Sequence, residues 1–430
     1  MKILFVLPYD TAYRYKAAFS ASISYAPLTL PALAALVPPE LCAEITLADE
    51  GVRRFDYEAE RYDIVGISLV TSSSARGYEL ARLMKSRSST VILGGHHASL
   101  MPAEAREHGD AVFIGAAEET LPQFFRDFAQ GKAKPFYDAH GVFPGRIPWP
   151  RRDLLPQRGY LPQPTVIANY GCGYGCAYCV IHDFWGCRAK RPIADVIAEI
   201  AALGKREILF MDPSPLSDIS YAKELYAELA KLNIRWAGLA GLNAADDEGL
   251  LELIRRSGCV GLLLGFESFR QADLDAMDKA QNKTARYKEI VSRLHDRHIS
   301  VLGTFMLGLD GDTKAEIERM PELIAETKID IPRYAILTPY PGTPLYRGLE
   351  AEGRILTRDW SKYDGLHCVF EPKQISAREL ESAFLALWEK TYDPGSILRR
   401  LRYPSSKRLA ALAANIGFHI YANKLGGLMG

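Results

Sequence analysis

Apolar runs and amphipathic stretches alternate along the first 130 residues. The apolar runs are short and bounded by polar turns, which is typical of parallel strands buried on both faces. They predict strands at 3–7, 44–47, 64–69, 91–93 and 111–114. The amphipathic stretches predict helices at 28–36, 75–84, 103–107 and 119–129. This alternation indicates a doubly wound, Rossmann-like α/β domain over residues 1–130, with its ligand on the loops beyond the carboxyl ends of the strands.

A second α/β region follows a proline-rich segment. Residues 131–164 contain seven prolines and little periodicity, so they are predicted to form a linker. The alternation then resumes, with predicted strands at 165–170, 207–211, 235–238, 260–264, 301–307 and 333–337. Helices are predicted at 193–203, 221–232, 248–256, 284–297 and 314–327. Six strand–helix units are too few for a closed eight-stranded barrel, so residues 165–346 are predicted to form a partial (β/α)6 barrel.

Residues 347–430 change to mostly helical patterning. A helix is predicted at 377–392 with Ser376 as its N-cap. Basic residues in the tail alternate with apolar and aromatic ones, at Arg399, Arg400, Arg402, Lys407, Arg408 and Lys424. This composition would suit peripheral contact with a membrane surface. A small helical subdomain with solvated charges is the favoured interpretation.

Composition adds limits on partners and compartment. The 52 Lys and Arg residues balance 52 Asp and Glu residues, so no net charge favours nucleic acid as a partner. The apolar run at the N-terminus ends at Pro8 and is too short for a signal peptide core. No apolar stretch has the length of a membrane-spanning helix. We therefore expect a cytoplasmic protein.

Three of the seven cysteines lie close together, in a C-x3-C-x2-C motif formed by Cys172, Cys176 and Cys179. Glycines at 171, 173 and 175 free the loop, so the three thiolates can converge on one soft metal centre. A structural zinc site needs a fourth ligand, which only Cys187 lies near enough to supply. The favoured interpretation is a [4Fe–4S] cluster with one iron left open.

This motif resembles that of the radical S-adenosylmethionine (SAM) superfamily, C-x3-C-x-aromatic-C, with Tyr178 at the aromatic position. The resemblance implies that SAM chelates the open iron and is cleaved to methionine and a 5′-deoxyadenosyl radical. It also implies a one-electron donor such as flavodoxin or ferredoxin. At the predicted strand ends, it places Asp212 near the amino group of SAM and Glu267 on the ribose diol.

Two later segments, 303–313 and 337–346, resemble a narrower group, the radical SAM enzymes with an N-terminal cobalamin-binding domain. In that group the first domain holds the dimethylbenzimidazole tail of cobalamin. The group's Gly-Gly-x-His loop matches Gly94, Gly95 and His97, with His96 at the variable position, and its Gly-Glu-Gly-Glu loop matches only at Gly115 and Glu118. Ser68 and Thr71, on the loop after the third strand, are further predicted contacts. The mutase-type D-x-H-x-x-G motif is absent.

The resemblance implies alkylation, most simply methylation, of an unactivated carbon, with methylcobalamin as the methyl donor. One alternative keeps both cofactors but oxidises, cyclises or rearranges its substrate. Another is a radical SAM enzyme whose first domain does not bind cobalamin, which Ala116 and Ala117 would favour. Methylthiolation of tRNA is disfavoured, because Cys42 stands alone where those enzymes carry extra cysteines.

The substrate class stays open at this stage between small molecules, lipids and tetrapyrroles. The candidate substrate contacts are aromatic residues on either side of the cysteine loop. They are Phe184 and Trp185, with His182 and Tyr170 beside them.

Overall fold

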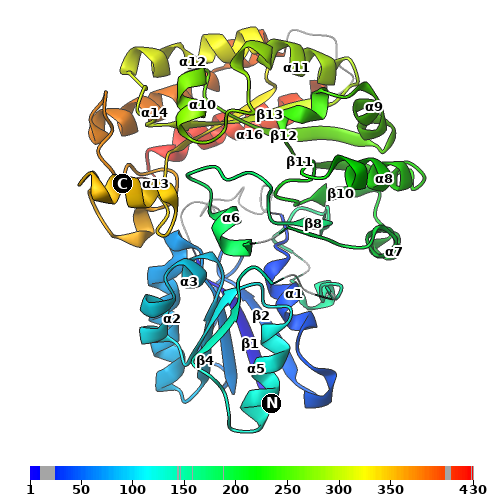
Figure 1. The fold of residues 1–430 in the computed structure, drawn as a ribbon, viewed down its shortest axis with the longest axis vertical. Helices are drawn as coiled ribbons and strands as arrows, with labels where there is room; N and C mark the ends of the chain where they lie inside the picture. Colours follow the sequence, from blue (N-terminus) through cyan, green and yellow to red (C-terminus); the bar gives the residue numbers. More distant parts are fainter. Residues whose placement is uncertain are drawn as a thin grey trace.

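The computed structural model describes residues 1–9, 25–142, 145, 147–156, 158–186, 188–401, 408–427 and 429. Two parallel sheets dominate the fold, one in each half of the elongated molecule (Figure 1). The first half contains the N-terminus, and the second half carries the barrel and the C-terminal helices (Figure 1). The helix α6 (Val180–Trp185), which follows the cysteine loop, lies between the two halves (Figure 1).

The first sheet has the strand order β2-β1-β3-β4-β5-β6, and every neighbouring pair in the described chain is parallel. Its strands are β1 (Lys2–Leu7), β2 (Glu44–Asp49), β3 (Ile64–Ser68), β4 (Thr90–Gly94), β5 (Ala111–Gly115) and β6 (Phe136–Ala139). Its helices are α1 (Thr29–Ala35), α2 (Ser74–Ser86), α3 (His96–Leu100), α4 (Pro102–His108) and α5 (Thr120–Ala129). Apolar residues on both faces of the sheet are buried under these helices.

Two elements of this domain differ from the sequence prediction. β6 lies inside the segment predicted as linker, so the first domain continues to Ala139 and the boundary at 130 was too early. The two alternating buried residues of β6, Tyr137 and Ala139, give only a weak strand pattern, which explains the miss. α3 was not predicted either, because five residues are too short for helical periodicity to register.

The second sheet runs in sequence order, β7-β10-β11-β12-β13-β14, as the partial barrel prediction requires. Its strands are β7 (Thr165–Val166), β10 (Glu207–Phe210), β11 (Arg235–Ala240), β12 (Cys259–Glu267), β13 (Ser300–Leu307) and β14 (Ile331–Ile336). The helices are α7 (Ile193–Leu203), α8 (Ile219–Leu229), α9 (Glu248–Arg256), α10 (Gln271–Ala276), α11 (Tyr287–His295) and α12 (Lys314–Thr327). They bury one continuous apolar core against the sheet.

The predicted strand at 165–170 is divided in the structure. Only β7 joins the barrel, whereas β8 (Asn169–Tyr170) pairs antiparallel with β9 (Ala189–Lys190) in a separate small sheet. The chain between β8 and β9 carries the cysteines and α6. This small sheet therefore closes the base of the loop that holds them. Cys187 lies outside the described residues.

The C-terminal region packs against the end of the barrel. It contains α13 (Pro344–Ala351), α14 (Ala377–Thr391), α15 (Pro394–Arg400) and α16 (Arg408–Leu425). Ser376 caps α14 as predicted, and its hydroxyl accepts a hydrogen bond from the Glu379 amide. Trp360 reaches back to the first domain, where its indole Nε1 donates to Glu104 Oε2 at 3.1 Å.

The basic tail is only partly visible. Arg402 and Lys407 lie outside the described residues, and α16 places Leu412 and Ile416 at the surface. Among the described helices, none combines the length and apolarity needed to span a bilayer.

Candidate active site between the two sheets

The cysteine loop is fixed to the mouth of the barrel through its backbone. The amide of Ala177 donates to the carbonyl of Met277 at 3.1 Å, and the amide of Leu345 donates to the carbonyl of Ala177 at 3.0 Å. Within the loop, the Cys179 amide donates to the Cys176 carbonyl at 3.0 Å. These bonds hold the middle of the loop between the end of α10 and the start of α13, so the thiols project from a braced segment.

All three thiols of the motif are partly buried. Burial raises the pKa of the Cys179 thiol to about 11 and also raises that of Cys176, while the ammonium of Lys279 acts in the opposite direction on both. Soft metal ions bind thiolates, so metal binding at this loop releases protons. Among the described residues, no three His, Cys, Asp or Glu side chains surround a single metal ion position. In an iron–sulfur cluster each cysteine binds its own iron, which does not require the sulfurs to meet at one point.

Glu267 lies beside this loop in a small charged network. The ammonium of Lys279 is 2.6 Å from Glu267 Oε1 and donates to the Tyr178 hydroxyl at 3.0 Å. The Glu267 and Lys279 side chains are only 10% and 13% exposed, so this is a nearly buried ion pair. Tyr178 and Glu267, both predicted from the sequence, are therefore brought together, and the structure adds Lys279 to them.

The backbone at Glu267 takes a conformation that non-glycine residues rarely adopt. Its φ is +67°, and the register between β12 and β13 shifts at this point. Asn282 and Tyr287 hold the irregular strand end by donating to the carbonyl of Phe266. Gly265 leaves the room that the ion pair occupies, because a Cβ there would lie 2.3 Å from Glu267 Oε1. Strain of this kind persists where the surroundings hold it, and it gathers at functional sites.

Asp212 has a different environment from Glu267. It is 2% exposed, and its Oδ1 accepts hydrogen bonds from the backbone amides of Ala168 (2.6 Å) and Asn169 (2.9 Å). Burial raises its pKa to about 6. The carboxylate thus positions the chain that leads from β7 into the cysteine loop. Its predicted contact with the amino group of SAM stays a prediction.

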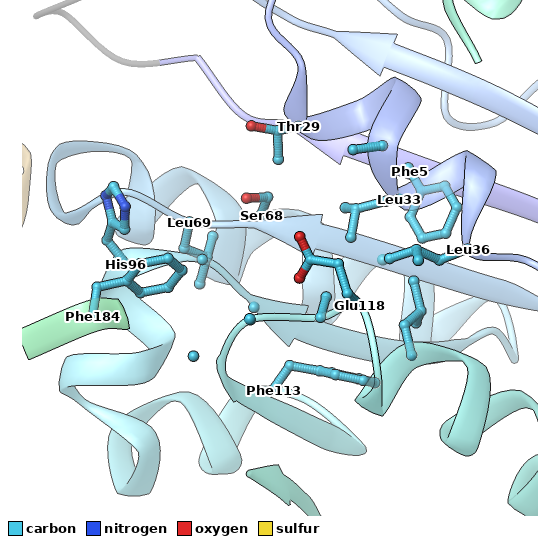
Figure 2. Close-up of a pocket in the computed structure, with 18 of the residues that line it drawn as sticks. Phe5, Thr29, Leu33, Leu36, Ser68, Leu69, His96, Phe113, Glu118 and Phe184 are labelled. Carbon is cyan, nitrogen blue, oxygen red and sulfur yellow. The ribbon is translucent and has the colours of Figure 1, made fainter. Parts of the chain in front are cut away.

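An apolar cavity of about 310 Å³ lies at the carboxyl ends of the first sheet (Figure 2). Its apolar wall includes Phe5 of β1, Leu33 of α1 and Leu36 directly after α1 (Figure 2). Glu118 points its carboxylate into this cavity (Figure 2), and burial raises the pKa of that carboxyl group. Of the residues predicted to bind cobalamin, Ser68, Gly94, Gly95, Gly115 and Glu118 all line it.

Gly95 allows two loops of the first domain to approach each other closely beside this cavity. Its backbone (φ +90°, ψ −175°) is accessible only to glycine, and a Cβ there would lie 2.6 Å from the Leu69 carbonyl oxygen. The loop after β4 therefore lies flat against the loop after β3, which leaves the cavity between the sheet and α1 open.

The two histidines after Gly95 diverge. His97 is fully buried and lines neither cavity; its Nε2 lies 3.1 Å from Glu104 Oε1, and Glu104 also accepts from Tyr78. His96 instead lines the apolar cavity and packs edge-on against Phe184 with ring centroids 4.3 Å apart (Figure 2). His96, at the variable position of the motif, therefore lines the cavity, whereas the predicted His97 does not.

A second cavity, of about 490 Å³, adjoins the first and opens between the two halves. The first domain contributes Thr71 and, at the end of β2, Asp49; the proline-rich segment contributes Tyr160, and α6 contributes Val180 and Ile181. Tyr340, from the loop after β14, closes the barrel side. Of the predicted substrate contacts, Tyr170, Phe184 and Trp185 line the first cavity and His182 lines neither.

Comparison with known proteins identifies both halves. The family model of the Radical SAM superfamily matches residues 166–324, and that of the B12 binding domain matches residues 47–125. The chain is 30% identical over 353 residues to bacteriochlorophyllide d C-12(1)-methyltransferase of Chlorobaculum tepidum, spanning 79% of this chain and 77% of that protein. The protein is a radical SAM enzyme with an N-terminal B12-binding domain.

Two further relatives extend this likeness over nearly the whole chain. Bacteriochlorophyllide d C-8(2)-methyltransferase of the same organism is 28% identical over 412 residues, covering 91% of this chain and 90% of its own. The structure of the radical SAM methyltransferase TsrM from Kitasatospora setae superposes with a TM-score of 0.68 at 17% identity, covering 98% and 99% of the two chains. This cobalamin-dependent radical SAM enzyme therefore belongs among the methyltransferases, and its cofactors are SAM, a [4Fe–4S] cluster and cobalamin.

The residues of each half fit these cofactors. Three thiols on one braced loop are the soft donors that a cluster needs. The Lys279 ammonium offers a cation for the carboxylate of SAM, and the Glu267 carboxylate beside it offers an acceptor for the ribose hydroxyls. The apolar cavity, within the size range of small-molecule sites, suits the flat benzimidazole tail of cobalamin.

Lys279 and His96 lie at the candidate site, but sequence reasoning did not single them out as possible ligand contacts. α10 is only six residues long, so the chain after it returns to the end of β12 and delivers Lys279 beside Glu267. The signal that could have identified Lys279 was its position three residues after a short helix that follows the strand ending at Glu267. His96 stood at a variable position of the motif and gave no signal of its own.

Proposed function

We propose that the protein transfers a methyl group to an unactivated carbon of a large, mostly apolar molecule of the tetrapyrrole class. The observation that carries this proposal is the cavity of about 490 Å³ that first-domain loops and α6 line together. A molecule held there touches the B12-binding domain on one side and the segment after the cluster cysteines on the other. When bound, the cluster with SAM supplies hydrogen abstraction, and cobalamin supplies the methyl group.

The lining of this cavity fits a polycyclic substrate. Tyr25, Tyr160 and Tyr340 provide aromatic surface, and Val180 and Ile181 provide aliphatic surface. Tyr160 is held in place because its hydroxyl donates to Asp49 Oδ2 at 2.8 Å. The relatives named above act, by their names, on bacteriochlorophyllide d, and a further relative, hopanoid C-2 methylase of Rhodopseudomonas palustris (25% identical), acts on a lipid.

Around the reacting centre, the proposed roles of the chain are binding and positioning. Cys172, Cys176 and Cys179 hold the cluster. Lys279, oriented by Tyr178, neutralises the carboxylate of SAM, and Glu267 accepts hydrogen bonds from its ribose. The apolar walls of both cavities exclude water from the radical chemistry.

The proposal is tested with the anaerobically reconstituted enzyme, trideuteromethyl-labelled SAM and bacteriochlorophyllide d, with a hopanoid as the comparison substrate. We expect a tetrapyrrole product that carries the label, together with 5′-deoxyadenosine whose formation depends on the substrate. Ile181→Trp, which fills the cavity, should abolish labelling, whereas Val142→Trp at an exposed position should not.

An unlabelled product from the tetrapyrrole would move the enzyme to the cyclase or oxidase class. Such relatives exist, because anaerobic magnesium-protoporphyrin IX monomethyl ester cyclase of Cereibacter sphaeroides is 25% identical over 378 residues. Labelling of the hopanoid alone would replace the tetrapyrrole by a lipid.

Two partners complete the proposal. The cluster requires a one-electron donor, for which we propose a flavodoxin or ferredoxin in an anaerobic cytoplasm. Leu398, Leu412 and Ile416, exposed on α15 and α16, are proposed to touch a membrane surface when an apolar substrate is collected. Sedimentation with anionic vesicles before and after substitution of Leu412 and Ile416 by Ser tests this contact; unchanged sedimentation would exclude it.

A further inference from the structure

His96 lies at the meeting point of two cavities. It lines both the apolar cavity and the cavity between the two halves, so it lies at their junction. Within the described part of the chain, neither ring nitrogen of His96 takes part in a hydrogen bond or ion pair. His96 is partly exposed, so its ring nitrogens are open to a ligand that enters either cavity.

The surroundings keep this imidazole neutral and oriented. Desolvation lowers the pKa of His96 to about 4, so at neutral pH one ring nitrogen presents an unprotonated lone pair. The Phe184 ring contacts it edge-on, with an angle of 78° between the ring planes, and α6 thereby fixes its direction from the barrel side. A neutral imidazole is the form that binds metals.

The adjacent histidine shows what a structural histidine looks like in the same loop. His97 has Thr71 Oγ1 at 3.4 Å from Nδ1 and Glu104 Oε1 at 3.1 Å from Nε2, so both of its nitrogens are occupied. His96 has neither kind of contact although it is one residue away. The same loop therefore carries a structural histidine, His97, and a histidine that faces the cavities, His96.

We propose that His96 donates a ring nitrogen to the lower axial position of the cobalt of bound cobalamin. The inference rests on the binding of cobalamin by this domain. The lone pair of the imidazole forms the axial bond, and the benzimidazole that leaves this position lies in the apolar cavity. No electron is gained or lost in this exchange of ligands. The chain thus supplies an axial histidine from the loop after β4, although it lacks the D-x-H-x-x-G motif.

The test is electron paramagnetic resonance of the full-length protein loaded with cob(II)alamin, prepared with natural-abundance and with 15N-histidine. The unpaired electron of cob(II)alamin lies along the axial direction and couples to an axial nitrogen. Because only the protein carries the label, we expect each cobalt line to change from a triplet to a doublet on labelling. His96→Phe, which keeps a ring against Phe184, should lose the splitting while still binding cobalamin. His108→Ala, outside both cavities, should retain it.

Each other result overturns the proposal and locates the error. A triplet that labelling does not change would assign the nitrogen to the cofactor's own benzimidazole. Absence of splitting with one cobalt per chain would exclude any nitrogen ligand while the cobalamin assignment stands. Absence of bound cobalt in the wild-type protein would overturn the cofactor assignment together with the role of His96.

Discussion

The two halves of the site treat their polar groups in opposite ways. At the barrel mouth the charged groups are paired with each other, as Lys279 is with Glu267 and Tyr178. In the first-domain cavity, His96 and Glu118 face an apolar space, and burial drives both toward their neutral forms. A ligand with two charges can enter a site of paired charges by exchanging partners. A flat apolar group needs walls and a few neutral donors.

The largest effect should come from removing a cluster ligand. In Cys176→Ala the loop keeps its backbone bonds but loses one of three thiolates, so we expect the bound iron and the cleavage of SAM to fall to background. Cys42→Ala, at an exposed thiol, is the matched control. Iron and sulfide counts with a deoxyadenosine assay measure both variants. Deoxyadenosine formation by Cys176→Ala would remove the cluster from this loop.

Breaking the ion pair at the barrel mouth comes next. Lys279→Met leaves the nearly buried Glu267 carboxylate without its cation, which should cost about 3–5 kcal/mol of stability and also weaken SAM binding. The exposed Lys283→Met is the matched control.

The double variant Lys279→Met/Glu267→Gln sharpens this result. Because it removes both charges, it should recover part of the stability but not the affinity for SAM. Urea unfolding and calorimetric titration with SAM separate the two quantities. Equal stability of the Lys279 and Lys283 variants would show that the pair contributes nothing to the fold.

The glycine beside the apolar cavity should give a smaller effect. Gly95→Ala forces a Cβ against the Leu69 backbone and should destabilise the first domain by about 1–3 kcal/mol and lower its retention of cobalamin. Gly131→Ala is the matched control, since Gly131 also has a positive φ (+69°) but a Cβ there meets nothing within 4 Å. Similar losses in both variants would mean that backbone strain alone, and not the close approach, matters at Gly95.

The last expected effect is a change in the pH dependence of stability, with no change in cofactor binding. The pKa of Asp212 is about 6 in the folded protein against 3.8 ordinarily, so the folded state holds its proton more tightly. The free energy of unfolding should therefore fall as the pH rises from about 4 through about 6, by at most about 1.4 kcal/mol per pH unit. Asp212→Asn keeps an acceptor for the two backbone amides but should flatten this slope. Chemical denaturation at a series of pH values measures it, and parallel slopes would contradict the assignment.

Sequence periodicity predicted the long elements well, because a buried strand or an amphipathic helix repeats its signal. α7, α9 and α12 have the predicted bounds. It failed at β6 and α3, which are too short to repeat a pattern, and at β7 and β8, which divide one apolar run between two sheets.

Within the site, the motif residues were predictable and their partners were not. The cysteine spacing and the strand-end Glu267 can be read locally, since neighbours in sequence carry them. Lys279 and His96 depend on which segments meet in space. The bulge that directs Glu267 toward Lys279 depends on Asn282 and Tyr287, whose role no local pattern reveals.

The hydrogen bond between Trp360 and Glu104 joins residues 256 positions apart, which has a consequence during synthesis. At translation rates of 5–20 residues per second, Glu104 leaves the ribosome roughly 13–50 s before Trp360 does. The first domain can fold in that interval, but the partly buried Glu104 carboxylate and the buried His97 beside it lack the indole of Trp360 until the last quarter of the chain is made. A nascent chain that stalls before residue 360 therefore carries a B12-binding domain in which Glu104 lacks its hydrogen bond from Trp360.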